Sequence, residues 1–142
     1  MSFDLEIING DLKIRSDGKI KTITDSAKLR QDIIKIIITS LGSNIFHPWY
    51  GCAIGESTIG KNLPENIFEM EIQTSIEQSL SKLKTLQMAQ STGQKVSLAE
   101  LIAEVGNIQA GRNPIDPRQI NIAVTILTKR LTNIEEVFTL IS

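Results

Sequence analysis

The fold of this chain is decided by a stretch near its C-terminus, QINIAVTIL at residues 119–127. Isoleucine or valine stands at every second position, with polar or small residues between. This period of two is typical of a β-strand that buries one face. A polar turn follows at residues 128–133, and the alternation resumes at Ile134, Phe138 and Leu140. The sequence therefore predicts a C-terminal strand hairpin.

The second strand of this hairpin is expected to lie at a sheet edge, because no later predicted element covers it. The backbone N–H and C=O groups of an edge strand stay unpaired unless another chain adds a strand to them. We therefore predict a partner-binding edge that consists of Val137, Phe138, Thr139 and Leu140.

A rigid charged corner, NPIDPR at residues 113–118, leads into the alternating stretch. Proline fixes its own φ at about −65° and restricts the residue before it, so Asp116, Pro117 and Arg118 have little conformational entropy left to lose. A carboxylate and a planar guanidinium supply an acceptor and a donor fork, which favours docking to a partner. The same residues also suit a simple turn, in which Asp116 caps backbone groups and Arg118 pairs within its own chain.

The N-terminal part of the chain predicts another hairpin. SDG at residues 16–18 lies between two alternating stretches, residues 11–15 and 19–24. An Asp-Gly pair in this setting indicates a tight turn, because both residues tolerate positive φ.

A helix is predicted after this hairpin. Asp25 or Ser26 can cap it, and Gly42 is a natural stop. The isoleucine-rich run at residues 33–38 would by itself suit a buried strand, since β-branched side chains lose freedom in a helix. The cap, the length and the terminal glycine favour a helix. Its expected core-facing residues are Ala27, Ile34, Ile37, Ile38 and Leu41.

A longer helix is predicted to begin at a capping-box pattern, NLPE at residues 62–65, and to end at STG, residues 91–93. A second capping box, SLAE at residues 97–100, predicts a short helix that reaches about Val105. The long helix is expected to bury Phe68, Ile72, Ile76, Leu80 and Leu83, and to expose Glu69, Gln73, Glu77 and Lys84.

Together these elements predict a single α+β domain over residues 1–142. We expect a small, mostly antiparallel sheet packed against two main helices, with an N-terminal hairpin and a C-terminal strand hairpin. A chain of this length can bury its own core.

The composition argues against several classes of function. With 15 Lys and Arg against 16 Asp and Glu, the net charge of −1 does not indicate binding to nucleic acid or to an anionic membrane. Cys52 and His47 are each the only residue of their type, so neither a disulfide, a cofactor nor a metal cluster is expected. Residues 1–4 lack the pattern of a signal peptide, and Lys35 interrupts the longest apolar run. We expect a soluble protein from a reducing compartment.

The only tryptophan and the only tyrosine lie together at Pro48-Trp49-Tyr50, within a glycine-rich loop at residues 42–61. Exposed aromatic side chains often anchor a protein partner, whereas buried ones close a domain's own core. The sequence leaves both interpretations open.

Several short motifs along the chain resemble a known family, the small baseplate wedge protein of contractile phage tails and related injection machines. This family is called the lysozyme-like or sheath-initiator family. The motifs are NGDL at residues 9–12, GKI at 18–20, QDI at 31–33, TSLGSN at 39–44, PWYG at 48–51 and Asp116-Pro117-Arg118. The last of these stands where the family has a Glu-Pro-Arg corner before its final strands.

The chain departs from the family pattern in two places. The corner acid is Asp116, which is one methylene shorter than glutamate. Residues 87–113 also add another helix and a glycine-rich bend between the long helix and the corner.

The resemblance implies a structural role without enzymatic activity. Copies of the protein, six by family resemblance, would surround the tail tube in the baseplate of a phage or a related injection particle made in the bacterial cytoplasm. The corner would hold a wedge protein, the last strands would present an edge to the first ring of tail sheath protein, and the tail tube is a further candidate partner.

Two other functions remain as alternatives. A soluble cytosolic adaptor could use the same edge and corner to bind one protein partner. A glycoside hydrolase needs two carboxyl groups about 5–10 Å apart across a sugar-binding cleft, and Glu65, Glu69 and Glu104 are the candidates. Glu65 is expected in a helix cap and Glu69 on a polar face, and an aromatic content of 4% leaves few surfaces on which sugars can stack.

Overall fold

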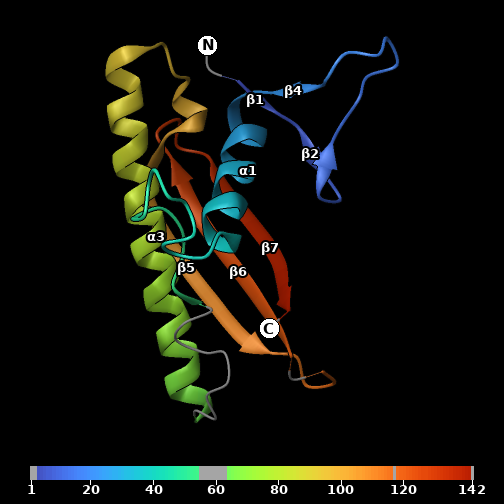
Figure 1. Cartoon of the computed structure of the whole chain (residues 1–142). Coiled ribbons are helices and arrows are strands. Elements are labelled where there is room, and N and C mark those ends of the chain that lie inside the picture. The colour runs from blue at the N-terminus through green and yellow to red at the C-terminus, as the bar shows by residue number, and fades with distance from the viewer. Residues whose placement is uncertain (1–2, 55–63, 117, 142) are drawn as a thin grey trace.

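The computed structural model describes residues 3–54, 64–116 and 118–141 (Figure 1). Its elements are β1 (Asp4–Leu5), β2 (Ile7–Ile8), β3 (Asp11–Leu12), β4 (Thr22–Ile23), α1 (Asp25–Ile38), α3 (Glu65–Gly93), the 3-10 turn η1 (Leu98–Glu100), β5 (Ile102–Arg112), β6 (Gln119–Thr128) and β7 (Asn133–Ile141). None of the helices in these described segments is long and apolar enough to cross a membrane.

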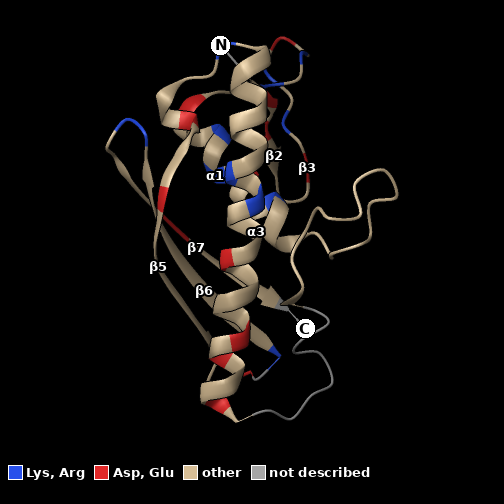
Figure 2. Ribbon diagram, turned by 90° about the vertical axis from the view of Figure 1, so that its left-hand side faces the viewer, with Lys and Arg blue, Asp and Glu red and all other residues tan. Residues whose placement is uncertain are grey.

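The main sheet is antiparallel, with the strand order β5-β6-β7. Both helices pack on one face of this sheet, so that the core lies between two layers (Figures 1 and 2). The predicted alternation of β6 is confirmed, because Ile120, Ile122, Val124 and Ile126 are all buried. The expected α+β fold, with a C-terminal strand hairpin, is therefore correct.

The expected short helix through Val105 is wrong. The cap at Ser97 exists, since its hydroxyl accepts a hydrogen bond from the amide of Ala99 at 3.2 Å, but only one 3-10 turn follows. From Ile102 onward the chain pairs with β6 as the long strand β5, which also replaces the helix and bend expected within residues 87–113. Pairing irregularities on both sides of residue 104 disturb the period of two and hide this strand in the sequence.

Helix α1 begins at Asp25 and ends at Ile38, before Gly42. The cap expected at Asp25 or Ser26 is wrong, because the helix begins earlier than either position allows. Thr24 occupies the N-cap position and makes no side-chain cap bond. The expected core face is mostly wrong. The buried apolar residues of the helix are Leu29, Ile33, Ile36 and Ile37, whereas Ala27 and Ile38 are exposed and Ile34 is half-buried. Isoleucines lie on both faces of this helix, so periodicity alone could not show which face the core takes.

Helix α3 spans most of the molecule and ends at Gly93, as predicted. Its expected core stripe is confirmed, since Phe68, Ile72, Ile76, Leu80 and Leu83 are buried. The cap predicted at Asn62 lies outside the described residues. Acidic side chains gather in the first half of the helix (Figure 2), where they are favoured by the helix dipole.

An N-terminal arm, which we define as residues 3–24, projects from this body (Figure 1). It contains the pairs β1–β4 and β2–β3 and the predicted turn at residues 16–18. The turn is closed by the amide of Arg15, which donates to the carbonyl of Lys19 at 2.7 Å. The predicted N-terminal hairpin is therefore present next to its turn, where Ile14 and Ile20 form a bridge. Further from the turn, residues 11–12 pair with β2 and residues 22–23 pair with β1.

Gln31 on α1 ties this arm to the body. Its amide nitrogen donates to Oδ2 of Asp4 at 3.0 Å and to the carbonyl of Leu5 at 2.7 Å. Its amide oxygen accepts from the main-chain amide of Ile7 at 2.9 Å. Lys35, one turn further along α1, forms an ion pair with Asp4. The arm is therefore fastened at its base by polar contacts.

Candidate docking site at the sheet edge

The two edges of the main sheet differ in how their backbone groups are satisfied. On the β5 side, Gln73 and Lys84 on α3 were expected to face solvent. Instead, Nε2 of Gln73 donates to the carbonyl of Ile108 at 3.1 Å, and Nζ of Lys84 donates to the carbonyl of Ala103 at 2.9 Å.

Gln87 completes this cover at the start of β5. Its side-chain amide donates to the carbonyl of Glu100 at 2.8 Å and accepts from the amide of Ile102 at 2.9 Å. Helix α3 thus supplies side-chain partners to this edge, which limits its ability to pair with another strand.

The β7 edge has no strand on its outer side within the described part of the chain. The amide of Thr128 donates to the carbonyl of Thr132 at 3.0 Å, and this bond sets the phase of the β6–β7 ladder. Because antiparallel pairs alternate, even-numbered residues of β7 bond to β6, and odd-numbered residues direct their N–H and C=O groups outward. Val137 and Thr139 therefore present backbone donors and acceptors at the open edge.

The four predicted edge residues divide between two environments. Val137 has 65% of its surface exposed, and the exposed Thr139 donates its hydroxyl to the side-chain oxygen of Asn121 at 3.1 Å. Phe138 and Leu140 are partly buried against the core. The side chains of Val137 and Thr139 are exposed, while those of Phe138 and Leu140 hold the strand on the body.

The predicted corner is the loop that joins β5 to β6. The amide of Asn113 donates to the carbonyl of Gln119 at 2.8 Å, and the amide of Gln119 donates to the carbonyl of Asp116 at 3.0 Å. The side chain of Asn113 accepts from the amide of Ile115 at 2.9 Å. These bonds fix the loop internally. Pro117 lies outside the described residues.

Asp116 and Arg118 contact each other within the corner, as the simple-turn interpretation expects. Oδ1 of Asp116 accepts from the amide of Arg118 at 3.1 Å and from its Nε at 3.3 Å. The side chain of Arg118 is nevertheless 77% exposed. An exposed pair of this kind adds little stability, and its guanidinium stays accessible to a partner. A docking role for this corner remains a prediction.

The corner and the end of β7 form one surface. Gln119 pairs with Ile141, so the loop that carries Asp116 and Arg118 lies beside the last residues of β7 (Figure 1). Sequence reasoning missed Ile115 at the tip of this loop, where the side chain is 93% exposed. An apolar residue between two prolines in an otherwise polar turn was the signal that could have identified it.

The aromatic cluster lies far from this surface. Trp49 borders a groove with Leu86 on the second half of α3, whereas Arg112 at the end of β5 stacks on Phe68, with Cζ 4.1 Å from the ring centroid. Eighteen residues of helix separate these points, or about 27 Å.

Neither of the two roles left open for Pro48, Trp49 and Tyr50 fits all three residues. Pro48 and Trp49 are exposed, and Trp49 contacts the ring of His47 with a centroid distance of 5.4 Å. Tyr50 packs against the core. Burial raises the pKa of the Tyr50 phenol, and the nearby ammonium of Lys35 only partly offsets this rise.

The described residues contain no cluster of three His, Cys, Asp or Glu side chains that could hold a metal ion. Cys52 is buried as a free thiol. Of the carboxylates considered for hydrolysis, Glu65 and Glu69 lie one turn apart at the start of α3. Glu104 follows Ala103, which contacts Lys84 about 22 Å further along that helix. The structure therefore does not bring Glu104 together with the other two.

Comparison with known proteins shows a likeness to solved structures. No protein-family model matches this sequence, and no curated protein matches it either. The chain resembles the crystal structure of a "putative tail lysozyme" from Geobacter sulfurreducens, with a TM-score of 0.61 and 14% sequence identity. The likeness covers 84% of this chain and 94% of that chain. The two chains share a fold. At this level of identity, the likeness extends to the fold alone.

Proposed function

We propose that this chain is a structural component of a contractile-tail baseplate, where it joins a wedge protein to the first ring of tail sheath. The observation that carries this proposal is the difference between the two sheet edges. Side chains of α3 cover β5, whereas β7 keeps an open ladder beside an exposed charged corner. A protein that binds a partner strand needs one open sheet edge, whereas a second open edge would promote aggregation.

The proposed mechanism is assembly by strand addition. A segment of the sheath protein pairs with the outward N–H and C=O groups of Val137 and Thr139, and main-chain bonds supply the affinity. The corner engages the wedge protein through Asp116 and Arg118, with Ile115 as an apolar contact. Copies arranged in a ring of six would then template the first sheath ring. No covalent step is required.

The fold likeness supports the proposal, because the neighbouring structure carries a tail-related name and covers most of both chains. Its name refers to lysozyme, and hydrolysis therefore needs its own test. A lone adaptor remains the second candidate, since an open edge serves that role equally well. Finding the chain in purified, sheathed particles would separate a particle component from a cytosolic adaptor.

Proline substitution at Thr139 tests the strand-addition step. Proline has no N–H, and at position 139 the donor it removes points outward, so the bonds to β6 are kept. We expect tails with baseplates but no sheath in electron micrographs of the Thr139→Pro variant. Sheathed tails of normal length would contradict the proposal. Deletion of residues 137–142 should give the same phenotype.

A further inference from the structure

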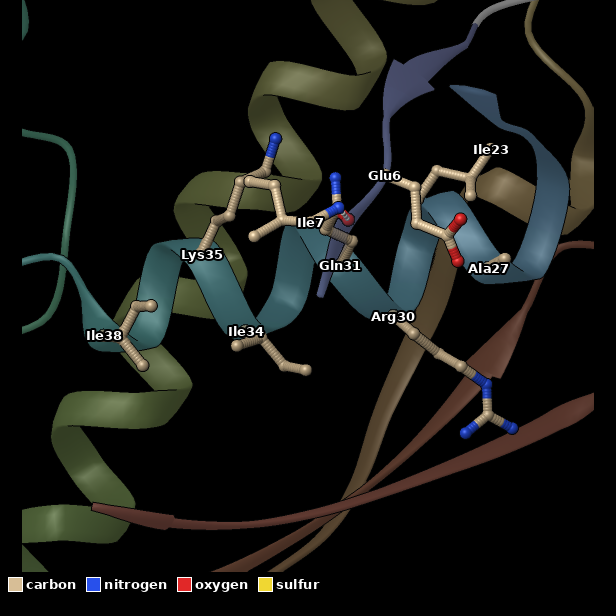
Figure 3. A pocket seen from close by; sticks show the side chains of 9 residues that line it. All are labelled: Glu6, Ile7, Ile23, Ala27, Arg30, Gln31, Ile34, Lys35 and Ile38. Carbon is tan, nitrogen blue, oxygen red and sulfur yellow. Dashed lines mark hydrogen bonds between the residues drawn. The ribbon is translucent and has the colours of Figure 1, made fainter. Parts of the chain in front are cut away.

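Helix α1 has a second row of side chains, one arginine and two isoleucines, which the fold buries only in part. Arg30, Ile34 and Ile38 recur every four residues and therefore lie on one side of the helix. Ile38 is 56% exposed, although its neighbours Ile36 and Ile37 are in the core. The row lines an open groove of about 300 Å³ between α1 and the N-terminal arm (Figure 3).

Arg30 fixes this row against the open edge of β7. Its Nη1 donates to the carbonyl of Glu135 at 3.0 Å and to the carboxylate of Glu136 at 3.1 Å. Figure 3 shows the guanidinium reaching away from the helix toward β7. Glu135 is one of the odd-numbered residues whose groups point outward, so Arg30 occupies an edge acceptor that a partner strand would otherwise use.

The two isoleucines continue from this point along the open part of the edge. Helix α1 and strand β7 run in the same direction (Figure 1). The eight residues from Arg30 to Ile38 rise about 12 Å, and the four residues from Glu135 to Thr139 span about 13 Å. Ile34 and Ile38 therefore lie further along α1 in the same direction in which Val137 and Thr139 follow Glu135 on β7.

We propose that Arg30, Ile34 and Ile38 form the receiving wall for the strand that is added to β7. This inference rests on the proposed strand addition and names the residues that limit and cover it. Arg30 ends the ladder at Glu135, so that pairing is confined to residues 137–141. Ile34 and Ile38 cover the side chains of the added strand that face α1.

The groove and the edge together determine the kind of partner. An apolar wall alone would accept many ligands, but here Arg30 lines the groove and also donates to the carbonyl of Glu135 on the open edge. Only a hydrogen-bonding backbone can satisfy the outward N–H and C=O groups of that edge. The partner is therefore an extended segment of about five residues. Its alternate side chains facing α1 should be apolar and β-branched, which suit a half-buried strand position.

Binding of the purified tail sheath subunit from the same particle tests the wall. We expect the Ile34→Ser, Ile38→Ser double variant to bind it at least about tenfold more weakly, because two apolar contacts are lost. Ile45→Ser is the matched control, since Ile45 is 89% exposed in the loop after α1, and its affinity should change less than about twofold. Equal affinities for the double variant and the control would show that Ile34 and Ile38 do not contact the added strand.

Amide hydrogen exchange in the same complex tests whether Arg30 ends the strand pairing at Glu135. In the wild-type complex, the amides of Val137 and Thr139 should gain protection and that of Glu135 should not. In Arg30→Ala, the amide of Glu135 should gain protection as well. Protection of the Glu135 amide in the wild-type complex would show that Arg30 does not limit the pairing.

These outcomes separate this inference from the proposed function. If Val137 and Thr139 are protected but the isoleucine variants bind normally, strand addition holds and the wall is wrong. If neither amide gains protection, strand addition at β7 is itself wrong, and the wall is wrong with it. Thermal unfolding of each variant shows that a changed affinity does not come from a changed fold.

Discussion

The main-chain amide of Asp25 donates a hydrogen bond to Oε1 of Glu100, at 3.3 Å and across 75 residues of sequence. Asp25 opens α1 with a positive φ of 54°, and Thr24 before it makes no side-chain cap bond. Glu100 is only 1% exposed. A buried carboxylate from a distant turn thus caps the helix at the end where its dipole favours negative charge.

This contact predicts that Glu100→Ala lowers the free energy of unfolding by about 1–3 kcal/mol, because a partly buried amide loses its acceptor. Glu100→Gln should lose less, since its amide oxygen can still accept. Urea denaturation measures both values. Glu104→Ala, an exposed glutamate on β5, is the control and should stay within about 0.5 kcal/mol of the wild type. Equal losses for Glu100→Ala and Glu104→Ala would exclude the cap.

A second stability prediction concerns Gly51. Its φ is +119°, and a Cβ at this position would lie 2.7 Å from the carbonyl oxygen of Thr39. The carbonyl of Gly51 also accepts from the buried hydroxyl of Ser79 at 2.9 Å, which holds the loop on α3. Gly51→Ala should therefore destabilise the protein by at least about 2 kcal/mol.

Gly42→Ala separates the two causes of this loss. Gly42 also has a positive φ, +83°, but a Cβ there would meet nothing within 4 Å. Only backbone strain of about 1 kcal/mol should appear. The two melting temperatures, measured side by side, test this difference. A loss for Gly42→Ala as large as that for Gly51→Ala would contradict the steric argument.

The third prediction concerns the pH dependence of the arm contact between Asp4 and Lys35. Burial tends to raise the pKa of Asp4, but hydrogen bonds from Lys35, from the amide of Leu5 and from Gln31 outweigh it and hold the pKa below its ordinary value of 3.8. Burial tends to lower the pKa of Lys35, yet Asp4 and Asp32 raise it above 10.5.

A carboxylate whose folded pKa is lowered adds stability above its unfolded pKa and loses it as the pH falls through the folded value. The raised pKa of Lys35 acts in the opposite direction, and its contribution is lost only above pH 10.5. The arm should therefore loosen in acid. Amide exchange at Ile7, corrected for intrinsic rates, should be faster at about pH 3 than at about pH 6. Asp4→Asn should remove this difference, and a difference that persists would contradict the prediction.

The sequence predicted those elements in which one period is clear. Ile120, Ile122, Val124 and Ile126 specify the buried face of β6 without ambiguity, and the stripe from Phe68 to Leu83 does the same for α3. Strand β5 was missed because the cap at Ser97 is a real helix signal, and the pairing irregularities that follow disturb the alternation. Local signals describe a turn well, but tertiary pairing decides what comes after it.

The candidate site was predictable in composition and only partly in geometry. The corner and the last strand were named from the sequence, but their proximity follows from the register of Gln119 with Ile141, which no local pattern encodes. The cover that α3 gives β5 depends on long polar side chains such as Gln73 and Lys84, which periodicity assigns to solvent. Contacts made by the flexible ends of such side chains cannot be inferred from their spacing.

The fourth prediction tests hydrolysis directly. Glu104 is separated from Glu65 and Glu69 by more than the spacing that a glycosidase pair requires. Glu65 and Glu69 lie one turn apart on the same helix, not on opposite sides of a cleft. Purified protein incubated with cell-wall glycan should therefore release no more reducing sugar than a heat-denatured sample. Release that disappears in Glu69→Gln would reverse this view and make the chain a hydrolase.

The last prediction concerns Arg118, whose guanidinium is 77% exposed while it contacts Asp116. Arg118→Ala should change the free energy of unfolding by less than about 0.5 kcal/mol, because exposed pairs contribute little. At a desolvated interface, the loss of one partner costs about 3–5 kcal/mol, so incorporation into baseplates should fall sharply. Arg118→Lys should restore only part of the incorporation, because an ammonium lacks the planar donor fork.

Arg15→Ala is the matched control, since Arg15 forms a similar turn pair with Asp17 at 3.5 Å on the arm. Incorporation of this variant should stay normal. Normal incorporation of Arg118→Ala would show that the corner is a simple turn.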